Sequence, residues 1–229
     1  MLQSATPTLV KPLPATATVV RAATPALRDA AFKLRYRAYR ATDSIPENGS
    51  QRFRDPYDYK PNAMTYLLMD GDEPNAMTYL LMDGDEPIGA IRAGVYIPER
   101  GIGLPSFESY RDEIALRIGF DRRIVEPSRF VTAETSFDVM LDTQFRLFRM
   151  IAANAVVHEA DWVITAMRRK HVAIYRRLFG MQPLSDPKPY PGVRDLGVLC
   201  GLPFRDFAAM CAAEPRLAID RDEAGRYAA

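Results

Sequence analysis

Two hydrophobic periods alternate along this chain, one typical of strands and the other of helices. Runs dominated by β-branched and other apolar residues predict strands at 17–24, 124–133, 161–167 and 195–200, with a β-hairpin over 74–96. Apolar stripes at three- and four-residue spacing predict helices at 25–41, 105–116, 141–160, 171–179 and 203–213. This order predicts an α/β fold with a mixed central sheet and helices on both faces.

Local signals define several of these boundaries. Thr24 and Pro25 are a typical helix N-cap and first helical residue, and Gly180 is a typical C-terminal cap. Ser106 is expected to cap the 105–116 helix, with Phe107, Tyr110 and Ile114 turned inward. The polar, turn-rich segment 42–60 is predicted to be a long loop with at most one helical turn, and loops of this length are often functional.

The sequence PNAMTYLLMDGDE occurs twice in succession, at 61–73 and at 74–86. One short identical repeat is not the pattern of a solenoid, which is built from many longer, divergent units. The surplus copy is expected either to loop out or to add an edge strand before the hairpin, and one copy is expected to be dispensable. Residues 1–16 are predicted to be a flexible N-terminal arm, and residues 17–229 a single domain.

Composition narrows the class of protein. The 229 residues carry a net charge of +1, and no apolar run approaches the length of a membrane helix, so we expect no membrane span and no dedicated nucleic-acid partner. Only two cysteines occur, which excludes a disulfide scaffold and a cysteine-based zinc site and favours a cytoplasmic location. His158 and His171 have no carboxylate at metal-ligand spacing, so no metal and no bound cofactor are expected.

Five motifs occur in a meaningful order: FKLRYRAY (32–39), DPYD (55–58), IGAIR (88–92), VEPSRFV (125–131) and HVAIYRRLFGMQPL (171–184). Together they resemble the N-acyl amino acid synthases and the related acyl-homoserine-lactone (autoinducer) synthases. The resemblance covers roughly residues 17–201. It implies a GNAT-like fold, the acyltransferase architecture that has the same order of elements.

The resemblance also implies an activity: transfer of a long-chain acyl group from the phosphopantetheine thioester of an acyl carrier protein to the amine of an amino acid. This chemistry needs a base for the amine and donors for the developing oxyanion. Glu126 is the candidate base, acting directly or through a water, and the oxyanion donors would be backbone N–H groups from Phe130 to Thr132. The alternative is a strand-end carboxylate paired with Arg92 or Arg129.

The resemblance assigns Arg129 to the catalytic site together with Glu126. Three residues apart in a strand, the two side chains face opposite sides of the sheet unless a bulge intervenes, and Pro127 favours irregular pairing. Arg129 and Arg92 are therefore expected to pair with Asp55 and Asp58 and to fix the 42–60 loop over the site. The alternative is an ordinary surface ion network.

Arg35 and Tyr39 are one helical turn apart, so they share a face beside the long loop. Arg35 is expected to bind the carboxylate of the acceptor amino acid through two parallel hydrogen bonds. The alternative is a surface arginine beside an interfacial tyrosine.

Two departures from the related families bear on substrate choice. The autoinducer synthases carry a tryptophan about ten residues after the first motif's arginine, whereas this chain has Ser44 and Ile45 there, which favours an amino acid as the acceptor. No glycine occurs between Gly119 and Gly180, so a tight pyrophosphate loop is not expected and a carrier protein is the favoured donor.

A basic segment provides the expected docking surface for an acidic carrier protein. Its positive residues are Arg168, Arg169, Lys170, Arg176 and Arg177. With no acid among them, they would steer association at modest salt. The alternatives are a solvated helix face or charges that complement the helix dipole.

Two other functions stay open for the whole chain: an acyl-homoserine-lactone synthase, and a non-catalytic module that binds an acyl carrier or acyl lipid.

Overall fold

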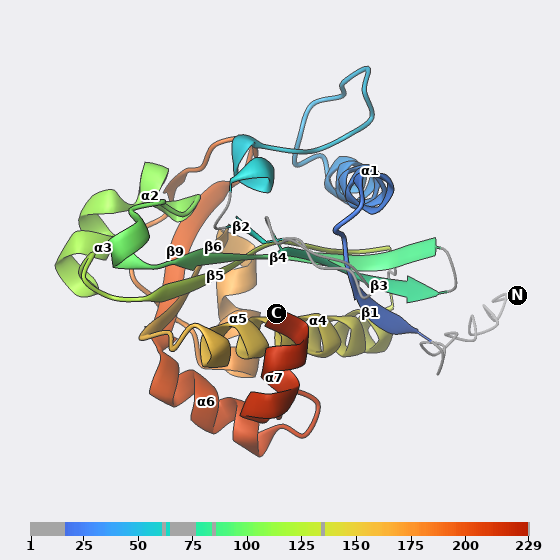
Figure 1. Ribbon diagram of the computed structural model, residues 1–229. Coiled ribbons are helices and arrows are strands. Elements are labelled where there is room, and N and C mark those ends of the chain that lie inside the picture. The colour runs from blue at the N-terminus through green and yellow to red at the C-terminus, as the bar shows by residue number, and fades with distance from the viewer. Residues whose placement is uncertain (1–16, 61–62, 65–76, 84–85, 134–135, 229) are drawn as a thin grey trace, which may run out of the picture.

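The computed structural model describes residues 17–60, 63–64, 77–83, 86–133 and 136–228, and its centre is one mixed β-sheet (Figure 1). Side by side lie β1 (Thr18–Arg21), β3 (Met77–Asp83), β4 (Glu86–Tyr96), β5 (Ile124–Thr132), β6 (Trp162–Arg168), β9 (Leu196–Pro203) and β7 (Gln182–Pro183). The short strands β2 (Ala63–Met64) and β8 (Lys188–Pro189) pair with β4 and β9. Of these pairings only β5–β6 is parallel, so the predicted mixed sheet is confirmed.

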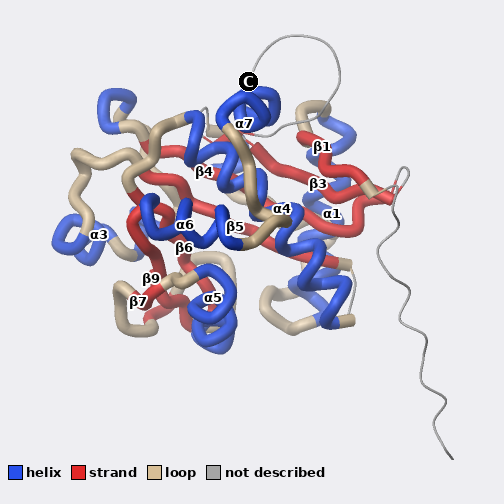
Figure 2. The backbone as a smooth tube through the Cα atoms, turned by 90° about the horizontal axis from the view of Figure 1, so that it is seen from below, coloured by secondary structure: helices blue, strands red, loops and turns tan. Residues whose placement is uncertain are grey.

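Helices cover both faces of the sheet, as the sequence pattern predicts (Figure 1). One face, here called the α1 face, carries α1 (Pro25–Ala41), the 3-10 helix η1 (Pro56–Tyr59), α2 (Ser106–Ser109) and α3 (Arg111–Arg117). The other, the α4 face, carries α4 (Phe137–Val157), α5 (Val172–Phe179), α6 (Phe204–Ala213) and α7 (Arg221–Ala228), which lie in front of the strands in Figure 2. The remaining 3-10 turns are η2 (Pro98–Arg100) and η3 (Arg169–His171).

The alternation of β4 divides the core between the two faces. Ile91, Ala93 and Val95 are buried in the cluster that includes α4, whereas Ala90 belongs to the cluster beneath α1 and Tyr96 to the one beneath α2 and α3. Successive strand residues point to opposite faces, so a single strand supplies apolar contacts to both layers. Arg92, next in the α1-face series after Ala90, therefore projects a charge into a buried layer.

Most predicted helix boundaries are confirmed, but those of the 105–116 helix are wrong. The Thr24 hydroxyl accepts the Leu27 N–H, and Gly180 ends α5 with a left-handed φ of 68°. The predicted 105–116 helix is instead broken at Tyr110, whose φ of −127° is not helical and whose ring is fully buried. Ser106 does not cap it, because the Ser106 hydroxyl donates to Glu126.

Two further differences concern helix extent. α4 spans Phe137–Val157, so it begins four residues before the predicted start and ends three residues before the predicted end. α7 was not predicted at all. It has no continuous apolar stripe, and it docks on α4 partly through an ion pair between Arg149 and Glu223 at 2.8 Å.

The two copies of the repeat pair with the same residue of β4. Met64, in the first copy, and Met77, its equivalent in the second, are both opposite Ala93 of β4. Ala63 continues the pairing to Gly94, and Thr78 continues it in the other direction to Arg92. Residues 1–16 and 65–76 lie outside the described residues. The predictions of a flexible N-terminal arm and of a looped-out copy or an added edge strand concern these residues and stay predictions.

Deleting one 13-residue copy should leave a folded protein. Removal of 61–73 or of 65–77 gives the same chain, in which Met64 is followed directly by the Thr78 that pairs with the next residue of β4. The expected result is a midpoint of thermal unfolding equal to or above that of the parent, with higher solubility, because no described pairing of β3 with β4 is lost. Calorimetry of both chains checks this. A deleted chain that no longer unfolds cooperatively would show that both copies are integral to the fold.

Candidate active site

A cavity opens where two strands of the sheet part. β5 and β6 are paired only at Ile124–Trp162 and Val125–Val163. Beyond these pairs lies a cavity of about 620 Å³, lined by 127–133 around the end of β5, by 165–168 of β6 and by residues of α1, α4 and α5. Its apolar wall consists of Leu34, Ala38, Phe130, Val131, Met140, Phe148 and Met167. This size is within the range of pockets that hold small-molecule ligands.

A β-bulge in β5 shapes the wall of this cavity. Ser128 is opposite Arg92 and Val131 is opposite Ala90, so Arg129 and Phe130 share one position of β4. Arg129 has a left-handed φ of 56°, which is uncommon for a residue other than glycine. The bulge brings Arg129 to the same face as Ser128. It therefore confirms the irregular pairing that Pro127 and the Glu126–Arg129 spacing predict.

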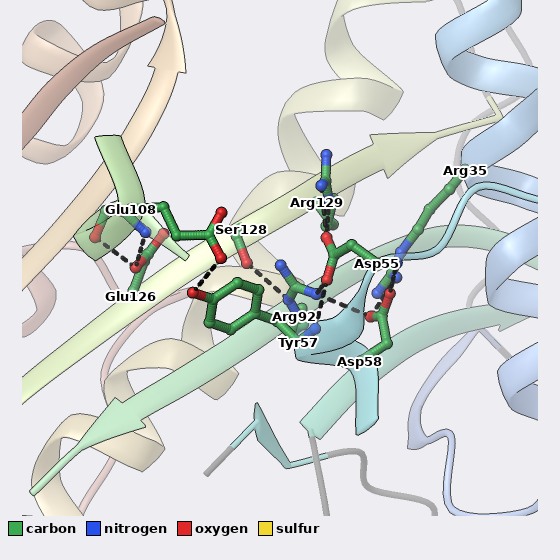
Figure 3. Close-up of polar contacts among 10 residues, drawn as sticks. Arg35, Asp55, Tyr57, Asp58, Arg92, Glu108, Glu126, Ser128 and Arg129 are labelled. Atoms are coloured by element: carbon green, nitrogen blue, oxygen red, sulfur yellow. Dashed lines mark hydrogen bonds and ion pairs between the residues drawn. The ribbon is translucent and has the colours of Figure 1, made fainter. Parts of the chain in front are cut away.

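Three arginines and two aspartates from distant parts of the chain form one buried cluster (Figure 3). Arg35 Nη1 donates to Asp58 Oδ1 at 2.7 Å. Arg92 Nη1 donates to Asp55 Oδ1 at 2.7 Å and to Asp58 Oδ1 at 3.1 Å. Arg129 Nε and Nη2 donate to Asp55 Oδ2 at 3.0 and 2.5 Å. The predicted ion cluster of Asp55, Asp58, Arg92 and Arg129 is confirmed, and it is buried rather than a surface network.

The two aspartates are positioned by the turn in which they occur. Asp55 is the N-cap of η1 and accepts the Tyr57 N–H at 2.9 Å, while Asp58 Oδ2 accepts the Asp55 N–H at 2.9 Å. This reciprocal capping box satisfies donors that the turn leaves free. Pro56 suits the first helical position, so the DPYD motif itself fixes both carboxylates against the arginines.

The cluster holds its charges in the ionised state. Burial by itself raises the pKa of the Asp55 carboxyl, but Arg92 and Arg129 outweigh burial and hold that pKa well below its usual range. Arg35 and Arg92 do the same for Asp58. Three guanidiniums face two carboxylates, so the cluster has a net charge of +1 beside the cavity that Arg92 and Arg129 line.

Arg35 is not placed to bind a substrate carboxylate, contrary to the expectation from its sequence motif. Its side chain is fully buried and engaged with Asp58, and it is not among the residues that line the cavity. Tyr39, one turn later, does line the cavity and packs against Phe53 of the 42–60 loop with ring centroids 4.8 Å apart. Arg35 thus acts as an internal counter-ion that joins α1 to the loop.

Glu126 is fully buried, on the side of the cluster toward α2 (Figure 3). Its Oε2 accepts the Ser106 hydroxyl at 2.7 Å and the Ser106 N–H at 3.2 Å. Within the described chain, Oε1 has no hydrogen-bond partner. The alternative pairing with Arg92 or Arg129 is therefore wrong, because Ser106 is the partner.

Burial raises the pKa of Glu126 to about 7, although the two Ser106 bonds oppose the rise. Glu126 itself does not line the cavity, but its neighbour Pro127 does, and so does Tyr190. Burial and then the charge of Glu126 raise the pKa of the Tyr190 hydroxyl.

The basic segment separates into two parts. Arg169, Lys170, Arg176 and Arg177 are exposed, while Val172, Tyr175 and Leu178 pack inward on the main core, as the helix pattern predicts. Arg168 is not part of this exposed face. Its Nη1 donates to Ser44 Oγ at 2.6 Å and to Asp195 Oδ2 at 3.2 Å, and the residue lines the cavity.

Several cavity residues were not found from the sequence: Arg37, Tyr190, Asp195 and His171 as a wall residue. Arg37 had a signal, since it lies three residues after Leu34 and four before Ala41 on one face of α1, and all three line the cavity. Tyr190 and Asp195 come from a loop that has no hydrophobic period. Burial and then Arg168 lower the pKa of His171 to about 4, so its imidazole is neutral near pH 7.

The described ranges contain no group of three or more His, Cys, Asp and Glu side chains arranged to hold a metal ion. In the same ranges no helix combines the length and apolarity that crossing a membrane requires.

The order of elements and the opened sheet are those of a GNAT-like fold. A structure from Lactobacillus plantarum assigned to the N-acetyltransferases has a TM-score of 0.51 at 15% identity, over 82% of this chain and 97% of that one. The CoA-dependent acyl-homoserine lactone synthase BjaI has a TM-score of 0.55 at 14% identity, over 92% and 97%. These likenesses are in the fold.

The structure of FeeM, an N-acyl amino acid synthase from uncultured soil microbes, has a TM-score of 0.62 at 20% identity, over 85% of this chain and 94% of that one. The more specific assignment comes from the sequence. Residues 30–203 match the family model described as N-acyl amino acid synthase FeeM, and the chain belongs to that family of acyltransferases. A search of curated proteins finds no significant sequence match.

Proposed function

We propose that the protein transfers a long-chain acyl group from the phosphopantetheine thioester of an acyl carrier protein to the α-amine of an amino acid. Family membership supports the reaction class. The observation that carries the proposal is the 620 Å³ cavity, which combines an apolar wall for an acyl chain with arginines beside the bulge of β5. An amino acid acceptor also accounts for a positive cluster next to the reaction site.

The proposed reaction forms one bond and breaks another. The amine nitrogen attacks the thioester carbonyl carbon, and collapse of the tetrahedral intermediate breaks the carbon–sulfur bond. One proton of the substrate ammonium passes to Glu126, and a second nitrogen proton goes to the departing thiolate. A base with a pKa of about 7 is well matched to this task. Because Glu126 does not line the cavity, the proton reaches it through a water or through Tyr190.

The arginine–aspartate cluster has a positioning role in this scheme. Arg92 ties Asp55, and with it the 42–60 loop, to β4, and Arg129 ties it to the bulge of β5. Backbone N–H groups from Phe130 to Thr132 are the candidate oxyanion donors, and both of these residues line the cavity. The net charge of +1 favours the negative charge that develops on the thioester oxygen.

Two features support a carrier protein rather than coenzyme A as the donor. The chain has no glycine between Gly119 and Gly180, and it therefore lacks the glycine-rich loop suited to a pyrophosphate at the start of α4. The exposed Arg169, Lys170, Arg176 and Arg177 suit an acidic partner. The fold does not decide between donors, since BjaI is described as CoA-dependent.

Reversing two charges of the exposed basic face should separate the two donors. For the double variant Arg176→Glu and Arg177→Glu we expect KM for an acyl carrier protein thioester to rise about tenfold or more, because steering by complementary charge is lost. KM for the matching acyl-CoA should change less than threefold, roughly the scatter between surface variants. Steady-state kinetics with both donors, repeated at high salt, measure this.

A matched control reverses two exposed arginines on other helices, Arg205 in α6 and Arg226 in α7. This control should leave KM for both donors unchanged. Equal effects of the α5 variant on the two donors would count against carrier docking at this face, while leaving the acyltransfer reaction itself intact.

Product analysis separates the remaining functions. Ser44, at the place of the autoinducer synthases' tryptophan, is buried and hydrogen-bonded to Arg168, so no aromatic ring is available there for a lactone precursor. Mass spectrometry of lipid extracts from expressing cells should reveal N-acyl amino acids. Acyl-homoserine lactones in their place would identify a lactone synthase, and tight acyl-carrier binding without a new lipid would identify a binding module.

A further inference from the structure

α1 presents one charged residue to the cavity on an otherwise apolar stripe. Leu34, Arg37, Ala38 and Ala41 recur at three- and four-residue spacing, and all four line the cavity. Arg37 is exposed rather than packed in the core. A guanidinium at this point of the wall faces the space where a substrate would lie.

A second guanidinium lines the same cavity from the end of β6. Arg168 is fixed by hydrogen bonds to Ser44 and Asp195, and its Nη2 lies 3.4 Å from His171 Nε2. The His171 imidazole is neutral, so the positive charges of Arg37 and Arg168 are balanced in this part of the wall only by the carboxylate of Asp195. This part of the wall therefore has a net charge of +1, and hydrogen bonds to Ser44 and Asp195 already set the orientation of the Arg168 guanidinium.

We infer that Arg37 and Arg168 bind the carboxylate of the acceptor amino acid. The inference rests on the proposed function and replaces Arg35, which is buried against Asp58. Guanidinium groups suit carboxylates because their donors match two carboxylate oxygens. With its carboxylate bound between these two residues, the acceptor presents its α-amine inside the cavity, whose wall continues to the bulge of β5.

The same two arginines could bind another anion, the phosphate of the donor's pantetheine arm. The two sources are distinguished by which substrate loses affinity. A carboxylate site raises KM for the amino acid alone. A phosphate site raises KM for the thioester donor alone.

The test combines one substitution in the protein with the replacement of the substrate carboxylate by a carboxamide. The common L-amino acids are screened with the wild-type protein and an acyl carrier protein thioester, and the best acceptor is paired with its own carboxamide. In Arg37→Met, KM for the amino acid should rise about tenfold or more with kcat nearly unchanged, the loss expected for one charge-assisted pair. KM for the carboxamide should stay unchanged, because it has no carboxylate to lose.

Arg168→Met should give the same selective loss, and Arg37→Lys should restore part of it. Arg205→Met, in an 85% exposed side chain of α6, is the control and should change neither KM. Circular dichroism confirms that each variant is folded, and because Arg37 is exposed its variant does not depend on the core.

Equal effects of Arg37→Met on the acid and the carboxamide, no effect on either, or an effect on the donor alone would each overturn the inference while acyltransfer persists. A wild-type protein that acylates no amine at all would instead refute the proposed function. The two failures are therefore distinguishable.

Discussion

Replacing Arg92 with methionine should lower the free energy of unfolding by about 3–5 kcal/mol, the loss typical when one partner of a buried ion pair is removed. The Arg92 side chain is 1% exposed and donates to Ser128, Asp55 and Asp58. Without Arg92, the carboxylates of Asp55 and Asp58, which are only 17% and 2% exposed, each lose a hydrogen-bond donor. Urea unfolding of wild type and variant measures the difference.

The control is a second arginine–aspartate pair that is partly exposed. Arg52 donates to Asp29, and both side chains are 34% exposed. Arg52→Met should lower the free energy of unfolding far less than Arg92→Met, because exposed ion pairs contribute little to stability. Should Arg92→Met fail to fold, Arg92→Lys, which keeps the charge but not the forked donors, should give an intermediate loss. Equal losses at Arg92 and Arg52 would mean that the buried cluster does not hold the loop to the sheet.

Replacing Glu126 with glutamine should lower kcat by about 10²–10⁴-fold, the contribution typical of a general base. Glutamine keeps an oxygen that can accept the Ser106 hydrogen bonds but cannot take a proton from the amine. Stopped assays of amide formation from a thioester measure the loss. The control is Glu108→Gln, an acid in α2 that accepts from the Tyr57 hydroxyl at 2.7 Å and should retain most of the activity.

The stability of the protein should fall as pH rises, because of Glu126. The pKa of Glu126 rises from 4.5 to about 7 on folding, so between these pH values the folded protein binds the proton more tightly than the unfolded chain. The free energy of unfolding therefore falls as pH rises through this window. A shift of this size corresponds to roughly 3 kcal/mol above pH 7, and glutamine removes the loss. The free energy of unfolding of Glu126→Gln, measured relative to that of wild type, should therefore increase from pH 5 to pH 8. A constant difference would place Glu126 in a solvated environment.

The strands and helices that position the site were predictable because their signals are local. Thr24 with Pro25, the polar 42–60 segment and the apolar run of β6 each specify one element by cap, turn or period. The break at Tyr110 could not be predicted this way. It arises because the buried Tyr110 ring stacks on Tyr190, a residue 80 positions along the chain, at a centroid distance of 6.0 Å.

The site was predictable as a set of charges, but the roles of its members depend on the tertiary structure. The Glu126–Arg129 spacing together with Pro127 indicated a bulge, and the bulge is present. The resemblance pointed to Arg35 rather than Arg37 as the arginine that binds substrate, although Arg37 shares a face of α1 with Leu34 and Ala41. Both arginines are in the same turn of α1, but one is fully buried against Asp58 and the other lines the cavity. Only the direction in which the helix packs separates them.

The most direct test of the account is product formation by the purified protein. Acyl carrier protein loaded with a long-chain acyl group is mixed with the common L-amino acids, and free thiol and N-acyl amino acid are quantified together by mass spectrometry. Wild type should release thiol and N-acyl amino acid in equal amounts, while folded Glu126→Gln should form both about 10²–10⁴-fold more slowly. An intact thioester after incubation with folded wild-type protein, for carrier-bound and CoA-bound acyl groups alike, would contradict the assignment of this cavity as an acyltransferase site.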